Sequence, residues 1–204
     1  LDTMSQNTDD IRIDNARPLI TPWVLADQLP GGATAKATVS SSRRSIEQIL
    51  AGNDPRLVVI AGPCSVHDPV ALLDFAHQFQ AACEPLADTL LPVLRVYFEK
   101  PRTIVGWKGL INDPDLDGSF HINKGLHLAR KVLLDVAELG LPAASEFLDN
   151  TFGQYYADLV SFGAIGARTV ESQIHRELAS GLSMPVGFKN GTNGHIDVAI
   201  DAIQ

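Results

Sequence analysis

A chain of 204 residues, of which 45% are hydrophobic and 20% charged, has the composition of a globular protein with enough apolar material for one core. Its net charge of −8 argues against a general nucleic-acid binder, because such proteins need a basic surface to neutralise phosphates. No apolar run reaches the roughly 18 residues of a membrane span, and the start of the sequence is acidic where a secretory signal would be basic. We therefore expect a cytoplasmic protein with no membrane or nucleic-acid partner.

The first 56 residues are predicted to form an N-terminal arm that precedes the main domain, residues 57–204. Residues 29–42 are rich in Gly, Ser, Thr and Ala, a composition typical of an exposed connector. Residues 43–50 predict a short helix, and Gly52 follows it in the position that commonly ends a helix.

From residue 57 onward, short apolar runs alternate with longer segments in which apolar residues recur every three or four positions. The short runs predict buried strands, and the longer segments predict amphipathic helices. Asp68 can cap the first of these helices, and Pro69 suits its first position. The predicted strands are residues 57–61, 92–98, 142–147, 163–166 and 185–188. The predicted apolar helix faces comprise Leu72, Ala76, Phe79, Cys83 and Leu86, then Leu126, Ala129, Leu133 and Val136, then Ile196, Ala199, Ile200 and Ile203.

This alternation of strand and helix implies an α/β fold with a parallel sheet and right-handed crossovers. Periodicity alone does not separate a doubly wound sheet from a (β/α) barrel. A full barrel needs eight strand–helix units and roughly 250 residues, so about five units after an arm would make an incomplete one.

Residues that carry charge or can bind a metal follow or end each predicted strand. In parallel α/β folds these strand ends share one rim, where ligands bind. In a chain with 16 basic and 24 acidic residues, basic residues gathered at one rim would focus a positive potential in a single cleft. Such a cleft suits substrates with several negative charges. The residues concerned are Cys64, Arg95, Lys100, Arg102, Glu146, Arg168 and Lys189.

Other polar residues receive a structural interpretation. Cys83 is expected in the core on a helix face, and no disulfide with Cys64 is expected in a reducing compartment. The spacing of the six histidines in the sequence predicts no partner for any of them, and we interpret them as structural or solvated. Trp107 and Lys108 lie in a loop that either closes over the substrates or packs on the rim. The charges expected to be solvated on helices are Arg43, Arg44, Arg130 and Lys131.

Four segments carry a specific resemblance: VIAGPCSVHDP, RVYFEKPRTIVGWKGLINDP, ASEFLD and GAIGARTVESQIHRELASGLSMPVGFKNGTNG. They resemble the type I 3-deoxy-D-arabino-heptulosonate 7-phosphate (DAHP) synthases from about residue 43 to the end, with fainter similarity in the arm. The resemblance implies a (β/α)8 TIM barrel, here incomplete. It also implies condensation of phosphoenolpyruvate with erythrose 4-phosphate, the first step of the shikimate pathway, and a need for a divalent metal.

The resemblance implies a binding role for most of these rim residues. Arg95, Arg168 and Lys189, with the backbone N–H of Ala167, would hold the phosphate and carboxylate of phosphoenolpyruvate. The sugar phosphate would be bound by Arg102 and Thr103.

The resemblance implies catalytic and metal-binding roles for the remaining residues. Lys100 would lie between the two substrates and protonate the alkoxide, and Glu146 would order the attacking water. Cys64 would be one metal ligand, with Mn, Fe, Co and Zn not distinguished. The family's other ligands, a His, a Glu and an Asp, come from later strands, so we expect this chain alone to be inactive and its barrel edges to associate.

The resemblance also implies a homo-oligomer that binds an aromatic amino acid as feedback inhibitor, with the arm of one subunit reaching another. The aligned positions are Asp9, Asp10, Gln154, Leu182 and Ser183.

Three other functions remain as alternatives. The sister synthase that uses arabinose 5-phosphate has a KANRS-like segment where this chain has KPRT, which argues against it. An aldolase would form a Schiff base on Lys100 or Lys189. A non-catalytic regulatory or assembly fragment would bind only an aromatic amino acid or a full-length partner.

Overall fold

The computed structural model describes residues 8–204, and within them five strands form one sheet in the order β1-β2-β3-β4-β5. Every neighbouring pair is parallel. Because each new strand joins the sheet beside the previous one, the order never reverses as it does in a doubly wound sheet. The sheet therefore has the strand order of an incomplete (β/α) barrel, as predicted. The strands are β1 (Leu57–Ala61), β2 (Leu90–Arg95), β3 (Ala143–Glu146), β4 (Phe162–Ile165) and β5 (Val186–Phe188).

The strand predictions are confirmed to within a few residues. The main difference lies in the second strand, predicted as residues 92–98, because β2 ends at Arg95. Beyond it Val96 still donates to the carbonyl of Ala144, at 2.8 Å, but Tyr97 turns its carbonyl to the N–H of Val66. The chain here leaves the sheet for a long loop.

Helices α3 (Pro69–Cys83) and α4 (Ile122–Glu138) pack against each other and beside β2 and β3, respectively. The predicted cap is confirmed, because the Asp68 carboxylate accepts the N–H groups of Val70 and Ala71 at 2.8 and 3.2 Å. On α4 the predicted face is confirmed as core, with Leu126, Ala129, Leu133 and Val136 all at 0% exposure.

The end of the α3 face was predicted wrongly. Cys83 is only partly buried, and Leu86 is 46% exposed. The helix has ended by then, and Leu86 belongs to the 3-10 turn η1 (Glu84–Leu86), which changes the direction of the side chains.

The arm contains more helix than predicted: α1 (Pro22–Gln28) and α2 (Ala33–Leu50). Helix α2 begins ten residues before Arg43, because Ala35, Val39, Ser42 and Ile46 all face the protein interior. Helix α2 packs against α4 and the sheet, so a composition typical of a connector here belongs to a packed helix. Ile46 also packs with Val93 of β2 and Ala144 of β3.

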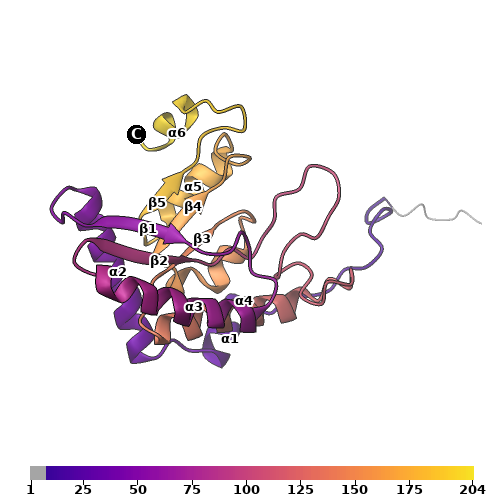
Figure 1. Cartoon of the computed structure of the whole chain (residues 1–204). Coiled ribbons are helices and arrows are strands. Elements are labelled where there is room, and N and C mark those ends of the chain that lie inside the picture. The colour runs from indigo at the N-terminus through magenta and orange to yellow at the C-terminus, as the bar shows by residue number, and fades with distance from the viewer. Residues whose placement is uncertain (1–7) are drawn as a thin grey trace, which may run out of the picture.

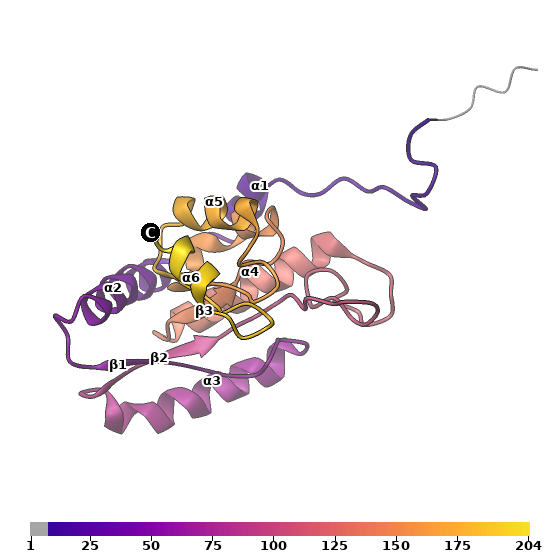
Figure 2. The same ribbon diagram turned by 90° about the horizontal axis from the view of Figure 1, so that it is seen from above.

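Figure 1 shows α2 at the end of the sheet from which β1 starts, and the long β2–α4 loop at the end toward which β1 points. Both views show the segment that precedes α1 running away from the rest of the chain (Figures 1 and 2). The remaining elements are η2 (Phe152–Tyr155), η3 (Ala157–Leu159), α5 (Gln173–Gly181) and α6 (Asp197–Ala202). No helix among residues 8–204 is both long and apolar enough to span a bilayer.

Arg130 is not the solvated charge that the sequence suggested, since it is only 2% exposed. Its guanidinium forms a two-pronged ion pair with Asp158, at 2.7 and 2.9 Å, and donates to the carbonyls of Leu29 and Tyr155, both at 2.9 Å. Arg43 is also partly buried and donates to carbonyls of the η3 region. These arginines fasten the arm to the barrel.

We predict that Arg130→Ala lowers the free energy of unfolding by about 3 kcal/mol, because it leaves buried carbonyls unpaired and a cavity. The neighbouring Lys131→Ala is the control, since its exposed pair with Asp135 should contribute less than about 0.5 kcal/mol. Urea unfolding measures both. Equal effects of the two changes would contradict the structural role of Arg130.

Candidate active site

The strand ends converge on a cleft of about 350 Å³. The prediction that these ends bring their polar side chains to one rim is confirmed. The cleft is lined by Cys64, Arg95, Tyr97, Glu99, Lys100, Pro101, Arg102, Glu146, Ala167, Arg168 and Lys189. Thr103 is exposed and stands outside this lining.

A larger cavity, of about 890 Å³, lies at the opposite end of the strands between α2 and α3. Its walls carry many Ser and Thr side chains and few groups that titrate or bear charge. We place the candidate active site in the smaller cleft, because several cations, carboxyl groups and a thiol meet there.

Arg95 ends β2 and reaches into the cleft. One guanidinium nitrogen donates to the carbonyl of Cys64 at 3.0 Å, and the guanidinium carbon lies 3.8 Å from the centre of the Tyr97 ring. Its Nε is buried and has no hydrogen-bond partner among the described residues. Burial of a polar group without a partner costs free energy, so this N–H is an unsatisfied donor of the site.

Cys64 is an exposed free cysteine in the loop after β1. The Lys100 ammonium donates to its sulfur at 2.9 Å. This hydrogen bond and the positive charge of Lys100 hold the pKa of the Cys64 thiol below its ordinary value, with smaller effects of Arg95 and Lys189. The thiolate, which is the form that binds metals and attacks electrophiles, is therefore favoured.

Glu146 ends β3, and its carboxylate lies 3.9 Å from the Lys189 ammonium. Lys189 follows β5, where its backbone N–H donates to Ile165 of β4 at 3.0 Å. A Cβ atom at Gly166 would stand 2.0 Å from a carboxylate oxygen of Glu146. Only glycine at this position leaves Glu146 where it is.

Glu99 is a second carboxyl group of the cleft, and the sequence interpretation missed it. It is 5% exposed and accepts the backbone N–H of Asp149 at 3.3 Å. Burial raises its pKa to about 7. The group therefore titrates near neutral pH. In the sequence, Glu99 stands at the end of an apolar run, and nothing there distinguished it as a residue of the site.

The segment that carries Lys100 and Arg102 is held in a narrow turn. The N–H of Lys100 donates to the carbonyl of Lys108 at 2.9 Å, and Glu99 forms an isolated bridge with Gly109. A Cβ atom at Gly109 would lie 2.1 Å from the carbonyl oxygen of Phe98, so this turn requires glycine. The Arg102 side chain donates to the carbonyl of Trp107 at 2.9 Å.

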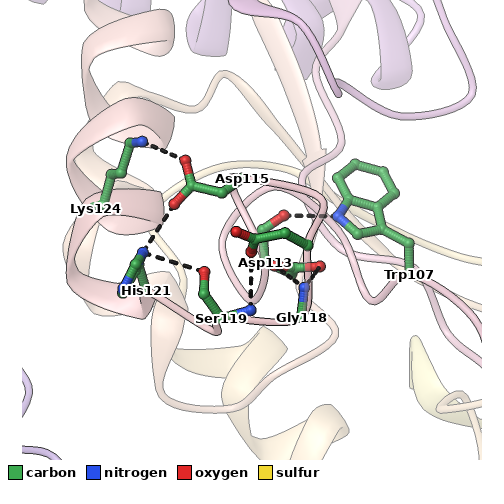
Figure 3. A network of polar contacts seen from close by, with 8 residues as sticks. Trp107, Asp113, Asp115, Gly118, Ser119, His121 and Lys124 are labelled. Atoms are coloured by element: carbon green, nitrogen blue, oxygen red, sulfur yellow. Dashed lines mark hydrogen bonds and ion pairs between the residues drawn. The ribbon is translucent and has the colours of Figure 1, made fainter.

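A polar network fixes the remainder of the loop (Figure 3). The Trp107 indole N–H donates to the carbonyl of Asp113 at 2.7 Å, and the Asp113 carboxylate accepts the N–H of Gly118. Asp115 is bound by both His121 and Lys124 at the start of α4, which holds its pKa below the ordinary value. Trp107 is partly buried and packs against the core in this structure, and closure of its loop over substrates stays a prediction.

Within one chain, Asp9 and Asp10 do not lie with the other residues predicted to bind an effector. Asp9 and Asp10 belong to the exposed segment that runs away from the barrel (Figure 1), whereas Leu182 and Ser183 follow α5. Gln154 lies in η2 with an exposed side chain. The prediction that the arm acts on another subunit remains a prediction.

Cys64 fits the role of a metal ligand, because its thiolate is favoured and exposed. Residues 8–204 bring no three His, Cys, Asp or Glu side chains together in a way that could hold an ion. This part of the chain therefore offers one ligand and no complete metal site.

Comparison with known proteins agrees with this geometry. Residues 33–204 match the DAHP synthetase I family. The chain belongs to this family.

Among curated members, the chain is 60% identical over 201 residues to the Phe-sensitive phospho-2-dehydro-3-deoxyheptonate aldolase of Escherichia coli K12, covering 98% of this chain. It is 57% identical over 199 residues to the Trp-sensitive enzyme of Buchnera aphidicola subsp. Baizongia pistaciae. The chain spans 57% of the length of each of these DAHP synthetase relatives. The phospho-2-dehydro-3-deoxyheptonate aldolase structure from Francisella tularensis SCHU S4 matches with a TM-score of 0.91 and 54% identity, over 94% of this chain and 56% of that one.

We predict that Lys100→Met slows alkylation of Cys64 by iodoacetamide several-fold at pH 7, because the thiolate loses its hydrogen bond and its nearest positive charge. The measurement uses a Cys83→Ala background and a chelator, so that only Cys64 reacts. Lys108→Met, in the same loop, should leave the rate unchanged. If Lys100→Met reacted as fast as the parent protein, the contact would not control the thiol.

We also predict a pH-dependent gain in stability for Glu99→Gln. The Glu99 carboxyl has a raised folded-state pKa, so its contribution to stability is complete below pH 4.5 and is lost as the pH rises through about 7. The amide side chain of the variant can still accept the Asp149 N–H but does not titrate. Between pH 5 and pH 8, urea unfolding should show the parent losing on the order of 2 kcal/mol relative to the variant. Parallel pH profiles would contradict this.

Proposed function

We propose that this chain contributes to a DAHP synthase, which condenses phosphoenolpyruvate with erythrose 4-phosphate to give DAHP and phosphate, the first step of the shikimate pathway. One observation carries the proposal: Arg95, Lys100, Arg102, Arg168 and Lys189 line a single small cleft with Glu146 and Cys64. An acidic chain that gathers cations in this way is suited to substrates that carry phosphate and carboxylate groups.

The phosphoenolpyruvate site is proposed at Arg95, Arg168, Lys189 and the backbone N–H of Ala167. Within residues 8–204, Arg95 and Arg168 have no ion pair with a carboxylate, so their charges are free for a ligand. Lys189 is close to Glu146 but keeps 42% of its side chain exposed. Guanidinium groups bind carboxylate and phosphate with two parallel hydrogen bonds, which would fix the orientation of the enol.

Lys100 is proposed to act between the two substrates. Carbon–carbon bond formation joins the enol carbon of phosphoenolpyruvate to the aldehyde carbon of the sugar, and the aldehyde oxygen becomes an alkoxide. Lys100, whose ammonium faces the Cys64 sulfur, would protonate that oxygen. Arg102 and Thr103 would bind the sugar phosphate on the outer side of Lys100.

Glu146 is proposed to order the water that completes the reaction. The bond-forming step leaves a positive charge on the former enol carbon, and a carboxylate beside it stabilises that charge and orients water. Water adds to this carbon, its proton passes to Glu146, and phosphate leaves with cleavage of the carbon–oxygen bond. Gly166, which has no side chain, leaves the space that the carboxylate occupies.

Cys64 is proposed as one ligand of a divalent metal, which as a Lewis acid would polarise the sugar aldehyde when bound. The other ligands would come from outside the described residues. The roles proposed for Lys100 and Glu146 are argued from the positions of these two side chains in the cleft.

A second candidate function is regulatory binding of an aromatic amino acid at Asp9, Asp10, Gln154, Leu182 and Ser183. It is favoured by two relatives, one described as Phe-sensitive and the other as Trp-sensitive. We propose it together with a homo-oligomer in the cytoplasm, in which the projecting arm of one chain meets the α5 region of another. Calorimetric titration with phenylalanine, tyrosine and tryptophan tests it, and heat from none of the three would contradict it.

The substrate proposal is tested by calorimetric titration of phosphoenolpyruvate into Arg168→Met. Arg168 is exposed, so its replacement should leave the fold intact and weaken binding at least about tenfold, the effect of losing a charge-assisted contact. Arg44→Met, an exposed cation that lines the larger cavity at the other strand ends, should bind as the parent does. Equal affinities for all three proteins would contradict the assignment.

A further inference from the structure

Tyr97 is placed beneath two of the cations that we assign to phosphoenolpyruvate. The centre of its ring lies 3.8 Å from the guanidinium carbon of Arg95 and 5.3 Å from the ammonium nitrogen of Lys189. We propose that Tyr97 is a positioning residue, whose ring face holds both cations in the arrangement that receives the substrate anion. This role rests on the function proposed above and deepens it.

An aromatic ring can hold a cation in position without neutralising its charge. A carboxylate would occupy the N–H donors of Arg95 and compete with an incoming anion. The face of an aromatic ring attracts a cation through its quadrupole and leaves those donors free. Arg95 shows this pattern, because one nitrogen donates to the Cys64 carbonyl while its buried Nε has no partner in the described part of the chain.

Lys189 has two close neighbours in the cleft. Its ammonium lies 3.9 Å from the Glu146 carboxylate and 5.3 Å from the centre of the Tyr97 ring. Arg95 and Lys189 repel each other as like charges, and their attraction to a shared ring offsets part of that repulsion. The two cations can therefore remain in one cleft before any anion arrives.

Tyr97 is itself firmly placed. It is 4% exposed, and its carbonyl accepts the N–H of Val66 at 2.8 Å, which ties it to the loop that carries Cys64. Burial raises the pKa of its hydroxyl, so the ring is neutral at pH 7. A neutral, buried ring suits a support for two cations.

The first test probes the position of Arg95 over the Tyr97 ring and needs no substrate. The Arg95 Hε resonance, assigned by NMR, should be shifted upfield by the ring current in the parent protein and in Tyr97→Phe, and should lose that shift in Tyr97→Leu. An Arg95 resonance at the ordinary arginine position in the parent protein would overturn the proposed support, whatever the variants do.

The second test is the affinity for phosphoenolpyruvate, measured by calorimetry. Tyr97→Leu should bind about tenfold more weakly, whereas Tyr97→Phe, which keeps the ring, should stay within about threefold of the parent. Phe75→Leu removes a ring from the outer helix α3 and should change nothing. Tyr97→Met replaces Tyr97→Leu if the latter does not fold.

Two results would overturn the role of Tyr97 alone: unchanged affinity in Tyr97→Leu, or equal loss in the Phe and Leu variants, which would point to the hydroxyl. A parent protein that shows the Arg95 ring-current shift but binds no phosphoenolpyruvate would instead overturn the proposed function, and this role with it.

Discussion

The structure depends on one electrostatic constraint, which is that several cations must share a small cleft without carboxylates to neutralise them. Among residues 8–204, only Lys189 of the proposed substrate-binding cations has an acidic partner at ion-pair distance, and that partner is the proposed catalytic Glu146. Arg95 and Arg102 are held by neutral groups, whereas Lys100 contacts a thiol that it favours in the thiolate form. Arg95 contacts a carbonyl and a ring, Arg102 a carbonyl, and Lys100 a thiol whose pKa it lowers.

The parallel strands of the fold bring these cations together. Their carboxyl ends lie at one rim, so single residues from distant parts of the chain meet there without any local motif. The rim is then stiffened by close backbone approaches. Gly109 closes the turn that carries Lys100, and Gly166 gives the Glu146 carboxylate its space. The Asp113 and Asp115 network anchors the outer part of the same loop to α4.

The sequence alone predicted the positions of the strands well, because strands appear as short apolar runs whose limits are marked by Gly, Pro and charged residues. Burial on both faces, which such runs also predict, holds for β3 but not for β1, where Leu57 and Ile60 are 65% and 38% exposed. The sequence also predicted the α4 core face and the Asp68 cap, which depend on local spacing. It failed for Arg130, because the groups that pair with this arginine include the carbonyl of Leu29, 101 residues earlier in the chain. It failed for α2 because small residues look like a connector until their packing partner is known.

The residues of the site, like the elements of the fold, were predicted from the sequence only in part. Charged residues at strand ends could be predicted, and the family resemblance supplied their expected roles. Tyr97 and Glu99 were missed, because an aromatic or acidic residue at the end of an apolar run also fits an ordinary core or surface position. A signal for Tyr97 did exist: it lies two residues after Arg95, so an extended chain places both side chains on one face. The raised pKa of Glu99 depends on burial that no local pattern reveals.

The most direct measurement of the central claim is a crystal structure of the protein soaked with phosphoenolpyruvate. We predict the ligand in the cleft of about 350 Å³, with its carboxylate and phosphate contacted by Arg95, Arg168 and Lys189, and with the Tyr97 ring beneath Arg95. Phosphoenolpyruvate bound elsewhere, or these three side chains turned away from one another around it, would contradict the account.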